Sequence, residues 1–569
     1  MMLLSLLQNR RTLARTFVAL ALLVTSSVTF AVAPADSAAK NDDPILHAMQ
    51  TELAREQAQL LLPGMQKPYF IEYRIEDFAS YELLANFGAL VREESGHQRV
   101  VRVTVRVGDY HTDSSTTRGE GTATFAPIDD NSQSIRYALW AATDEAYKNA
   151  LRAYSAKLAA LKRFEGAPQE GDFAPPSDPA KPVIYIAPLV PLNIDRAEWK
   201  RRIVDASGLY ASDPEVRANA ANVQFSSANL RAAAINRYLV NTEGTVVREG
   251  YGGYSANISV GTQAPDGMEL TRDNGSVATT AKDLESWPAF RHRVIDDLKN
   301  LEALRNAPVV PADDYHGPVL FSGDAASSIM EAHFIPNVQA TRPEMGTTAR
   351  TQGAYTSSLH SRVLPDFLSA TDDPLTTTFA GHPLLGAYAI DDEGVPAQPV
   401  KVVVNGTLEN YLIGRTPIRD FPESNGHGRA ALGQAAHPHS GVMIIKSNAP
   451  LSSAAMNARL LAMAKDQGHD VYYVETLGGP LAPRVLYLVH PDGTRQLVRG
   501  AVFDELDTRS LRSDILAAGD DPYVDNTLGP IPTTTIAPSL LFDDVGVKRA
   551  TSEQQKLPYY PPPPTDSAK

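Results

Sequence analysis

The sequence predicts an α+β protein, in which an N-terminal domain of one sheet plus helices is followed by a β-rich C-terminal domain with short helices. Residues 99–107 alternate apolar and polar side chains, which is the period of a half-buried strand. Residues 134–161 carry apolar side chains every three or four positions, which is the period of an amphipathic helix. The second half contains short apolar runs separated by Gly and Pro, as in sheets of short strands.

The N-terminal domain is expected to span residues 40–308. In chain order we expect a polar helix at 44–62, strands at 69–73, 85–91 and 99–107, a long helix at 134–161, a helix from Asp195, strands within 223–260 and a closing helix at 280–305. Asp195 and Glu198 have the spacing of a helix N-cap, and residues 241–244 have the composition of a hairpin turn. Five prolines within 166–182 indicate a surface linker inside this domain.

The C-terminal domain is expected to span residues 309–550. Its predicted elements are a short helix at 323–334 and strands at 400–404, 408–413, 485–489 and 496–502. Asn405-Gly406 and Asp492-Gly493 fall between these strands, and both pairs favour tight hairpin turns. Residues 551–569 end in a run of four prolines, which is typical of a disordered tail.

The first 35 residues have the order of a secretory signal peptide. Arg10, Arg11 and Arg15 precede an apolar run at 17–24, and Ala33 and Ala35 suit a cleavage site after Ala35. The apolar run is shorter than the ~20 residues that a membrane helix requires. We therefore expect an exported protein, periplasmic or extracellular, with no stable membrane span.

Composition excludes several kinds of chemistry. The chain has 569 residues, a formal net charge of -14 and no cysteine. An acidic chain without a visible basic cluster is unlike a nucleic-acid-binding protein, so we expect no nucleic-acid partner. The lack of cysteine removes disulfides, thiol nucleophiles and cysteine metal ligands.

Two local motifs suggest other sites. Residues 426–431 match the glycine spacing of a dinucleotide-binding loop, but no strand precedes them and the acidic residue expected further on is missing, so a glycine-dependent loop is the better interpretation. His437 and His439 flank Pro438 and lie on one side of an extended segment, which provides two metal ligands at most. His316, His360 and His382 each stand alone in an expected loop, with no partner at ligand spacing.

The second half resembles the TldD/PmbA family, the modulator-of-gyrase metallopeptidase group, across roughly residues 314–548. The landmarks are the Gly323-Asp324-Ala325-Ala326 helix start, the segment 391–396, the Asn405-Gly406 turn, the 426–429 glycine motif and a closing strand pair around Asp492-Gly493. In active family members the helix that corresponds to 323–334 carries His-Glu-Ala-x-Gly-His, and a cysteine from the closing strands completes the zinc site.

The resemblance implies that this zinc site is degenerate here. Alignment on the Glu-Ala pair places Met330 and Ile335 at the two histidine positions and Glu331 at the general-base position, while the cysteine position falls near Pro483. His333 lies two residues after Glu331, about 200° around a helix, and so it cannot replace either ligand in the same register. The PmbA-type branch of the family also lacks the zinc motif. It keeps the fold and forms a pair with a zinc-bearing sister protein.

Two hypotheses follow from this resemblance. The first is an exported member of the family without zinc or another cofactor, acting as a non-catalytic partner subunit or a peptide-binding scaffold. Its partner is a sister subunit or a second copy, and its ligand is peptide or unfolded polypeptide held near Asp391, Asp392, Glu393 and Gly394. The second is an active peptide hydrolase with a rebuilt zinc site that uses Glu331, His333, His437 and His439. Whether the chain is an enzyme stays open at this point.

Overall fold

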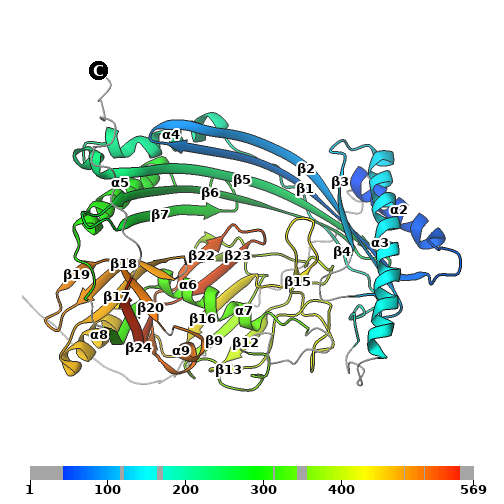
Figure 1. Ribbon diagram of the computed structural model, residues 1–569. Helices are drawn as coiled ribbons and strands as arrows, with labels where there is room; N and C mark the ends of the chain where they lie inside the picture. The colour runs from blue at the N-terminus through cyan, green and yellow to red at the C-terminus, as the bar shows by residue number, and fades with distance from the viewer. Residues whose placement is uncertain are drawn as a thin grey trace, which may run out of the picture. The chain divides into compact units, whose positions relative to one another are not determined.

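The computed structural model describes residues 43–115, 121–162, 171–311, 314–342, 355–479, 481–504 and 506–550. The predicted signal peptide, the first part of the predicted linker and the predicted tail lie outside these residues. The described residues form helices and several sheets joined by loops, and the predicted α+β class is confirmed (Figure 1). Within the described part of the chain, no helix is both long and apolar enough to cross a membrane.

The N-terminal half is built on one seven-stranded sheet. Its strands are β1 (Pro68–Asn86), β2 (Ala89–Val107), β3 (Thr122–Ala126), β4 (Ile184–Ile186), β5 (Val223–Asn241), β6 (Val246–Gln263) and β7 (Glu269–Ala278). The strand order is β3-β2-β1-β5-β6-β4, and β7 pairs with the other part of β6. Strands β1, β2, β5 and β6 are long, and each neighbouring pair among β2, β1, β5 and β6 is antiparallel.

Two separate groups of helices cover the two ends of these long strands (Figure 1). Helices α2 (Pro44–Gln59) and α3 (Ser132–Leu161) pack on one end, where Ile71, Val103 and Ile135 are buried together. Helices α4 (Arg196–Ser212) and α5 (Trp287–Asn306) pack on the other end, against Leu83 and Leu230, and the short 3₁₀-helix η1 (Arg217–Asn222) follows α4. One sheet therefore serves two apolar cores.

Two sheets form the C-terminal half. The first has the order β13-β12-β9-β16-β23-β22 and the second β19-β18-β17-β8-β24-β20, with β21 beside β24. The first contains β9 (Leu368–Asp372), β12 (Val400–Val404), β13 (Thr407–Leu408), β16 (Val442–Ser447), β22 (Tyr523–Thr527) and β23 (Thr533–Ala537). The second contains β8 (Tyr315–Phe321), β17 (Val471–Gly478), β18 (Ala482–Val489), β19 (Arg495–Val498), β20 (Ala501–Asp504), β21 (Ile515–Ala518) and β24 (Leu540–Arg549).

Helices and short strand pairs complete this half. They are helices α6 (Gly323–His333), α7 (Ile335–Val338), α8 (Ser453–Gln467) and α9 (Thr508–Ser513), and the pairs β10 (Thr378–Phe379) with β11 (His382–Pro383) and β14 (Gly428–Arg429) with β15 (His437–Pro438). Side chains of β8 point alternately to the two faces of its sheet, and helices α6 and α8 lie on opposite faces. Val319 and Phe321 belong to the core that contains α6, whereas Leu320 points to the opposite face and packs under α8.

Most predicted elements are confirmed, with corrections at their ends. The predicted strand at 85–91 is wrong, because Phe87 and Gly88 have positive φ values of 50° and 80° and form the turn between β1 and β2. The closing helix begins at Trp287 rather than at residue 280. The strand predicted at 408–413 ends at Leu408, and that predicted at 496–502 breaks at Gly500, where φ is 73°.

Other local predictions have clear outcomes. Asn405 and Gly406 have φ values of 46° and 81°, as a type I′ hairpin turn requires, and the Asp195 side chain accepts a hydrogen bond from the Glu198 N–H at the start of α4. The predicted linker is not at the surface throughout: Asp172, Phe173 and Ala174 are buried, and the Arg415 guanidinium stacks on the Phe173 ring. His316 and His382 lie in β8 and β11 rather than in loops.

Candidate functional site

Helix α6 is the element at which the family resemblance places the catalytic centre. Its N-terminus is capped by Ser322, whose Oγ accepts a hydrogen bond from the Ala325 N–H. The helix packs against β17, β22 and β23. One face buries Ala325, Ala326, Ile329 and Met330 in the largest core of the protein, and the other face carries Asp324, Ser327 and Glu331.

The three positions aligned with zinc ligands do not fit zinc. Met330 is 0% exposed and Ile335 is 7% exposed, and both lie in the apolar core with Phe334. Pro483 lies in β18 and has no side-chain donor atom. Zinc sites in proteins use imidazole, thiolate or carboxylate ligands, and the side chains of Met330, Ile335 and Pro483 supply none of these. We therefore derive no chemical step through zinc at this position.

Carboxyl groups gather on the polar side of α6. We call Asp324, Glu331 and Asp525 of β22 the α6 carboxyl group. The Ser327 hydroxyl donates to the Asp525 carboxylate over 3.1 Å, and one oxygen of Glu331 is buried with no partner among the described residues. Burial, reinforced by the negative charge of Asp525, raises the pKa of Glu331 to about 7 and that of Asp324 to about 6.

The histidines of the rebuilt-site hypothesis are spread over separate elements. His333 is half-buried at the end of α6, and burial lowers its pKa. The His437 and His439 rings are 5.7 Å apart at β15, and burial lowers the pKa of His439. Among the described residues, no group of three or more His, Cys, Asp or Glu side chains is placed to hold a metal ion. The structure thus gives the pair at β15 no third ligand of these types.

The predicted peptide-binding segment 391–394 forms a tight turn. The Asp391 carboxylate accepts hydrogen bonds from the backbone N–H groups of Glu393, Val395 and Gly428, and Gly394 adopts φ 78°. The carboxylate of Glu393 accepts from the Arg415 N–H. Asp391 and Asp392 are buried, so their carboxylates stabilise this turn and its contacts; peptide binding by the segment stays a prediction.

Asp392 joins the two halves of the chain. Its carboxylate pairs with Arg237 of β5 and with the Arg429 Nε of β14, and it accepts from the Ala430 N–H over 2.8 Å. All three charged side chains are buried. The two guanidinium groups outweigh the desolvation of the carboxylate and lower the pKa of Asp392 to about 2. We call Arg237, Asp392 and Arg429 the Asp392 cluster.

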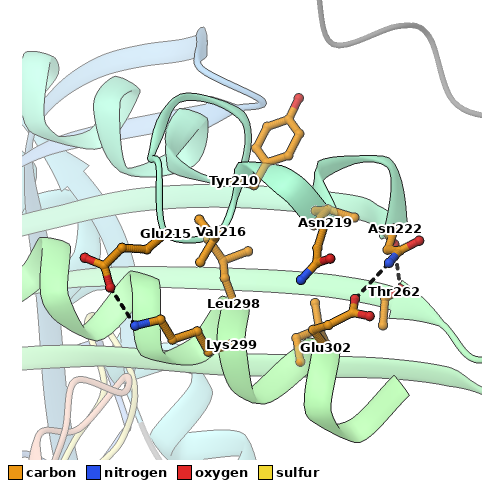
Figure 2. A pocket seen from close by; sticks show the side chains of 11 residues that line it. Tyr210, Glu215, Val216, Asn219, Asn222, Thr262, Leu298, Lys299 and Glu302 are labelled. Carbon is orange, nitrogen blue, oxygen red and sulfur yellow. Dashed lines mark hydrogen bonds and ion pairs between the residues drawn. The ribbon is translucent and has the colours of Figure 1, made fainter. Parts of the chain in front are cut away.

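Figure 2 shows a small cavity in the N-terminal half, between α4, η1 and α5. Its volume is about 30 Å³, which is room for one or two water molecules. Lys299 pairs with Glu215 over 2.7 Å, and the Asn222 amide donates to Glu302 over 2.9 Å. Because these charged groups are already paired across the cavity walls, we assign it no binding role.

Sequence reasoning missed most of these polar groups. Asp324, Ser327 and Glu331 recur at helical spacing, so their common face could have been recognised. Asp525 could not, because it is about 200 positions away and reaches α6 only through the packing of β22. The same applies to the buried pair of Asp372 and His427, whose carboxylate and Nε2 are 3.3 Å apart. His427 belongs to the glycine motif at 426–429, whereas Asp372 lies at the end of β9.

This sequence and this architecture resemble those of known proteins. Residues 314–549 match the family model described as the PmbA/TldA metallopeptidase C-terminal domain. No functionally curated protein matches the sequence.

Three crystal structures share the fold. A putative modulator of a DNA gyrase from Thermotoga maritima is 16% identical with a TM-score of 0.59, and the likeness covers 88% of this chain and 99% of that one. TldE from Thermococcus kodakarensis is 13% identical with a TM-score of 0.56 and the same coverage. A putative modulator of DNA gyrase from Bacteroides thetaiotaomicron is 11% identical with a TM-score of 0.59, covering 90% and 99%.

The family model covers the second half of the chain, and the three structures share the fold over most of it. Residues 314–549 of this chain therefore match the C-terminal domain of the TldD/PmbA family.

Proposed function

We propose that this protein is an exported, metallopeptidase-like member of the TldD/PmbA family that acts as a non-catalytic partner subunit or peptide-binding scaffold. One observation carries the proposal: the two positions aligned with the histidine ligands of the family are occupied by Met330 and Ile335, and both side chains are packed in the apolar core. A ligand at either position would require a polar group in that core, which costs free energy unless it is paired.

The positions of the other candidate ligands support the same proposal. His333 ends α6, whereas His437 and His439 lie at β15, and no three His, Cys, Asp or Glu side chains in the described ranges are placed to hold a metal ion. A hydrolytic zinc centre needs about three such protein ligands, and these side chains do not form that set.

Metal analysis of the purified protein tests the proposal. We expect a zinc content far below one ion per chain after incubation with zinc and gel filtration, together with a fully folded circular dichroism spectrum. Stoichiometric zinc that is lost in His333→Ala or His437→Ala would overturn the proposal and favour the rebuilt hydrolase site. His360→Ala serves as the matched control, because His360 is exposed and its ring pairs with Glu409 away from α6 and β15.

A peptidase assay supplies the second readout. Unfolded casein should remain intact in the presence of the protein, with and without added zinc, and Glu331→Gln should not change the background rate. Cleavage that disappears in Glu331→Gln would show that Glu331 acts as a base and would overturn the non-catalytic role.

Export is supported by the sequence of residues 1–35 alone. Fusing these residues to a reporter that is active only outside the cytoplasm should give signal, and replacing Arg10, Arg11 and Arg15 with Gln should reduce it. A reporter that stays inside the cell with the intact leader would contradict this part of the proposal.

A further inference from the structure

The first half of strand β2 forms an uncovered edge of the N-terminal sheet. Strand β3 pairs only with residues 99–103 of β2, and no other strand in the described part of the chain pairs with the outer side of residues 89–98 (Figure 1). Residues 89–97 are all exposed, whereas the part of β2 beside β3 is mostly buried. A long strand edge of this kind can pair with a strand from another molecule.

The hydrogen bonds at the ends of the ladder show which backbone groups of β2 face outwards. The Ile71 carbonyl accepts from the Thr242 N–H beside β5, so odd-numbered residues of β1 bond to β5 and even-numbered residues bond to β2. The Val107 carbonyl accepts from the Ser114 N–H on the outer side of β2. Both observations direct the odd-numbered residues of β2 away from β1.

Three residues therefore present outward N–H and C=O groups that no described residue pairs with, namely Glu93, Ser95 and His97. On one side the series ends at Val91, a β-bulge that the pairing of β1 with β2 skips. On the other side it ends at Arg99, which pairs with β3. The open edge is thus the segment 92–98, and Ser95 is its centre.

The charged side chains of this segment do not protect the edge. Proteins commonly guard an exposed edge with charges that a second strand would have to bury unpaired. Here the charges already have partners on the faces of the sheet or on α4: Arg92 pairs with Glu82, Glu93 with Lys200 and His97 with Asp77. A second strand beside the segment would meet little uncompensated charge.

We propose that two copies of this chain pair through segment 92–98, antiparallel and about a two-fold axis at Ser95, so that their N-terminal sheets become continuous. Ser95 is then opposite the second copy's Ser95, and Glu93 is opposite the second copy's His97. All outward N–H and C=O groups of both segments are hydrogen-bonded in this register. The inference specifies the partner subunit of the proposed function, and in that respect it rests on that function.

Neighbouring registers satisfy fewer backbone groups. A shift of two residues in one direction places Glu94 opposite the second copy's Glu94 and His97 opposite the bulge at Val91. A shift in the other direction places Glu93 opposite Arg99, whose backbone already pairs with β3. The register centred on Ser95 opposes no like charges, since its other facing pairs are Arg92 with Gln98 and Glu94 with Gly96.

Cysteine cross-linking of the full chain tests the register, because the chain contains no cysteine. Opposed residues of a hydrogen-bonded antiparallel pair have Cα atoms about 5.5 Å apart, which a disulfide can span. We expect Ser95→Cys to form a disulfide-linked dimer under mild oxidation, and Ala123→Cys, on the exposed edge of β3, to stay monomeric. Cross-linking of Glu94→Cys but not of Ser95→Cys would overturn the register. Equal cross-linking of Ser95→Cys and Ala123→Cys would overturn the contact.

Sedimentation velocity measures the dimer without a cross-link. The contact is small for a specific interface, so we expect a dissociation constant in the micromolar range. Ser95→Pro removes an outward N–H that the monomer does not use, and it should weaken the dimer about tenfold or more. Ala123→Pro removes an outward N–H from β3 and should leave the dimer unchanged. Circular dichroism checks that both variants are folded.

A wild-type chain that stays monomeric up to its solubility limit would overturn the proposal. A folded Ser95→Pro variant that dimerises as tightly as the wild type would also overturn it, and so would pairing of an extended peptide with the edge of a chain that does not dimerise. Zinc content measured on the same samples reports the proposed function independently of these results.

Discussion

Two groups of buried or half-buried carboxyls in this protein are built in opposite ways. In the Asp392 cluster, one carboxylate is paired with two arginines, and its pKa falls to about 2. In the α6 carboxyl group, three carboxyls lie on one side of a helix with a serine hydroxyl, and the pKa of Glu331 rises to about 7. Asp392 is fully buried and the carboxyls of α6 and β22 are half-buried, so burial does not explain the lower pKa of Asp392; its two paired arginines do.

Pairing with cations therefore decides which of the two groups is ionised at neutral pH. Asp392 is held ionised between the two halves, whereas the environment of α6 favours protonated carboxyls. At neutral pH the Asp392 cluster stabilises the fold, whereas ionised carboxylates in the α6 carboxyl group destabilise it. The following predictions test this contrast, beginning with the largest expected effect.

Removing the charge of Asp392 should destabilise the protein most. In Asp392→Asn, Arg237 and Arg429 lose their shared counterion in a buried place, and breaking such a pair costs about 3–5 kcal/mol. Urea unfolding at pH 7 measures the change. Asp205→Asn is the control, because Asp205 forms an exposed pair with Arg201 and should cost below about 1 kcal/mol. Equal effects in the two variants would contradict the role of Asp392.

Truncating the side chain at the first aligned ligand position should reveal a packing role. Met330→Ala should lower the free energy of unfolding by about 2–5 kcal/mol, because it leaves a cavity in a fully buried core. Zinc content should stay unchanged in this variant. A variant that is as stable as the wild type would show that Met330 does not fill the core.

The α6 carboxyl group should make stability fall as pH rises. The folded pKa of Glu331, about 7, lies above its unfolded value of about 4.3, so the folded protein holds more protons between these values. The contribution of protonated Glu331 is therefore present below about pH 4 and is lost as pH rises through 7. Glu331→Gln should raise stability at pH 8 by about 1–3 kcal/mol and leave it nearly unchanged at pH 4, as measured by urea unfolding at both values.

Asp392 should behave in the opposite sense. Its folded pKa of about 2 lies below the unfolded value of about 3.9, so its contribution is present above pH 4 and is lost as pH falls towards 2. Acid unfolding followed by tryptophan fluorescence should have a shallower slope over pH 2–4 in Asp392→Asn than in the wild type. Parallel acid unfolding curves would show that another carboxylate controls this range.

The smallest effect is expected at β15. His437 is exposed, and His437→Ala should change stability by less than about 0.5 kcal/mol. Thermal unfolding checks this value. A large loss would show that the histidine pair has a structural role that the contacts at β15 do not explain.

Much of the fold could be predicted from local patterns. The alternation at 99–107, the helical period at 134–161 and the Asn405-Gly406 turn depend on neighbouring residues, and each has its expected form. The turn at Phe87-Gly88 was missed because the apolar residues of 85–91 continue through the hairpin, although Ala85 is buried in β1 and Leu90 and Val91 are exposed in β2. The Asp392 cluster could not be predicted, since Arg237, Asp392 and Arg429 meet only after three separate segments pack together.

The long strands of the N-terminal sheet have a further consequence for folding. Side chains from opposite ends of β1, such as Ile71 and Leu83, enter different cores, yet one uninterrupted ladder of backbone hydrogen bonds connects them. A slip of one residue in the pairing of β1 with β5 would turn apolar side chains outwards at both ends at once. The packing of either core therefore favours the same strand register as the other. A misaligned intermediate would lose apolar burial in both cores.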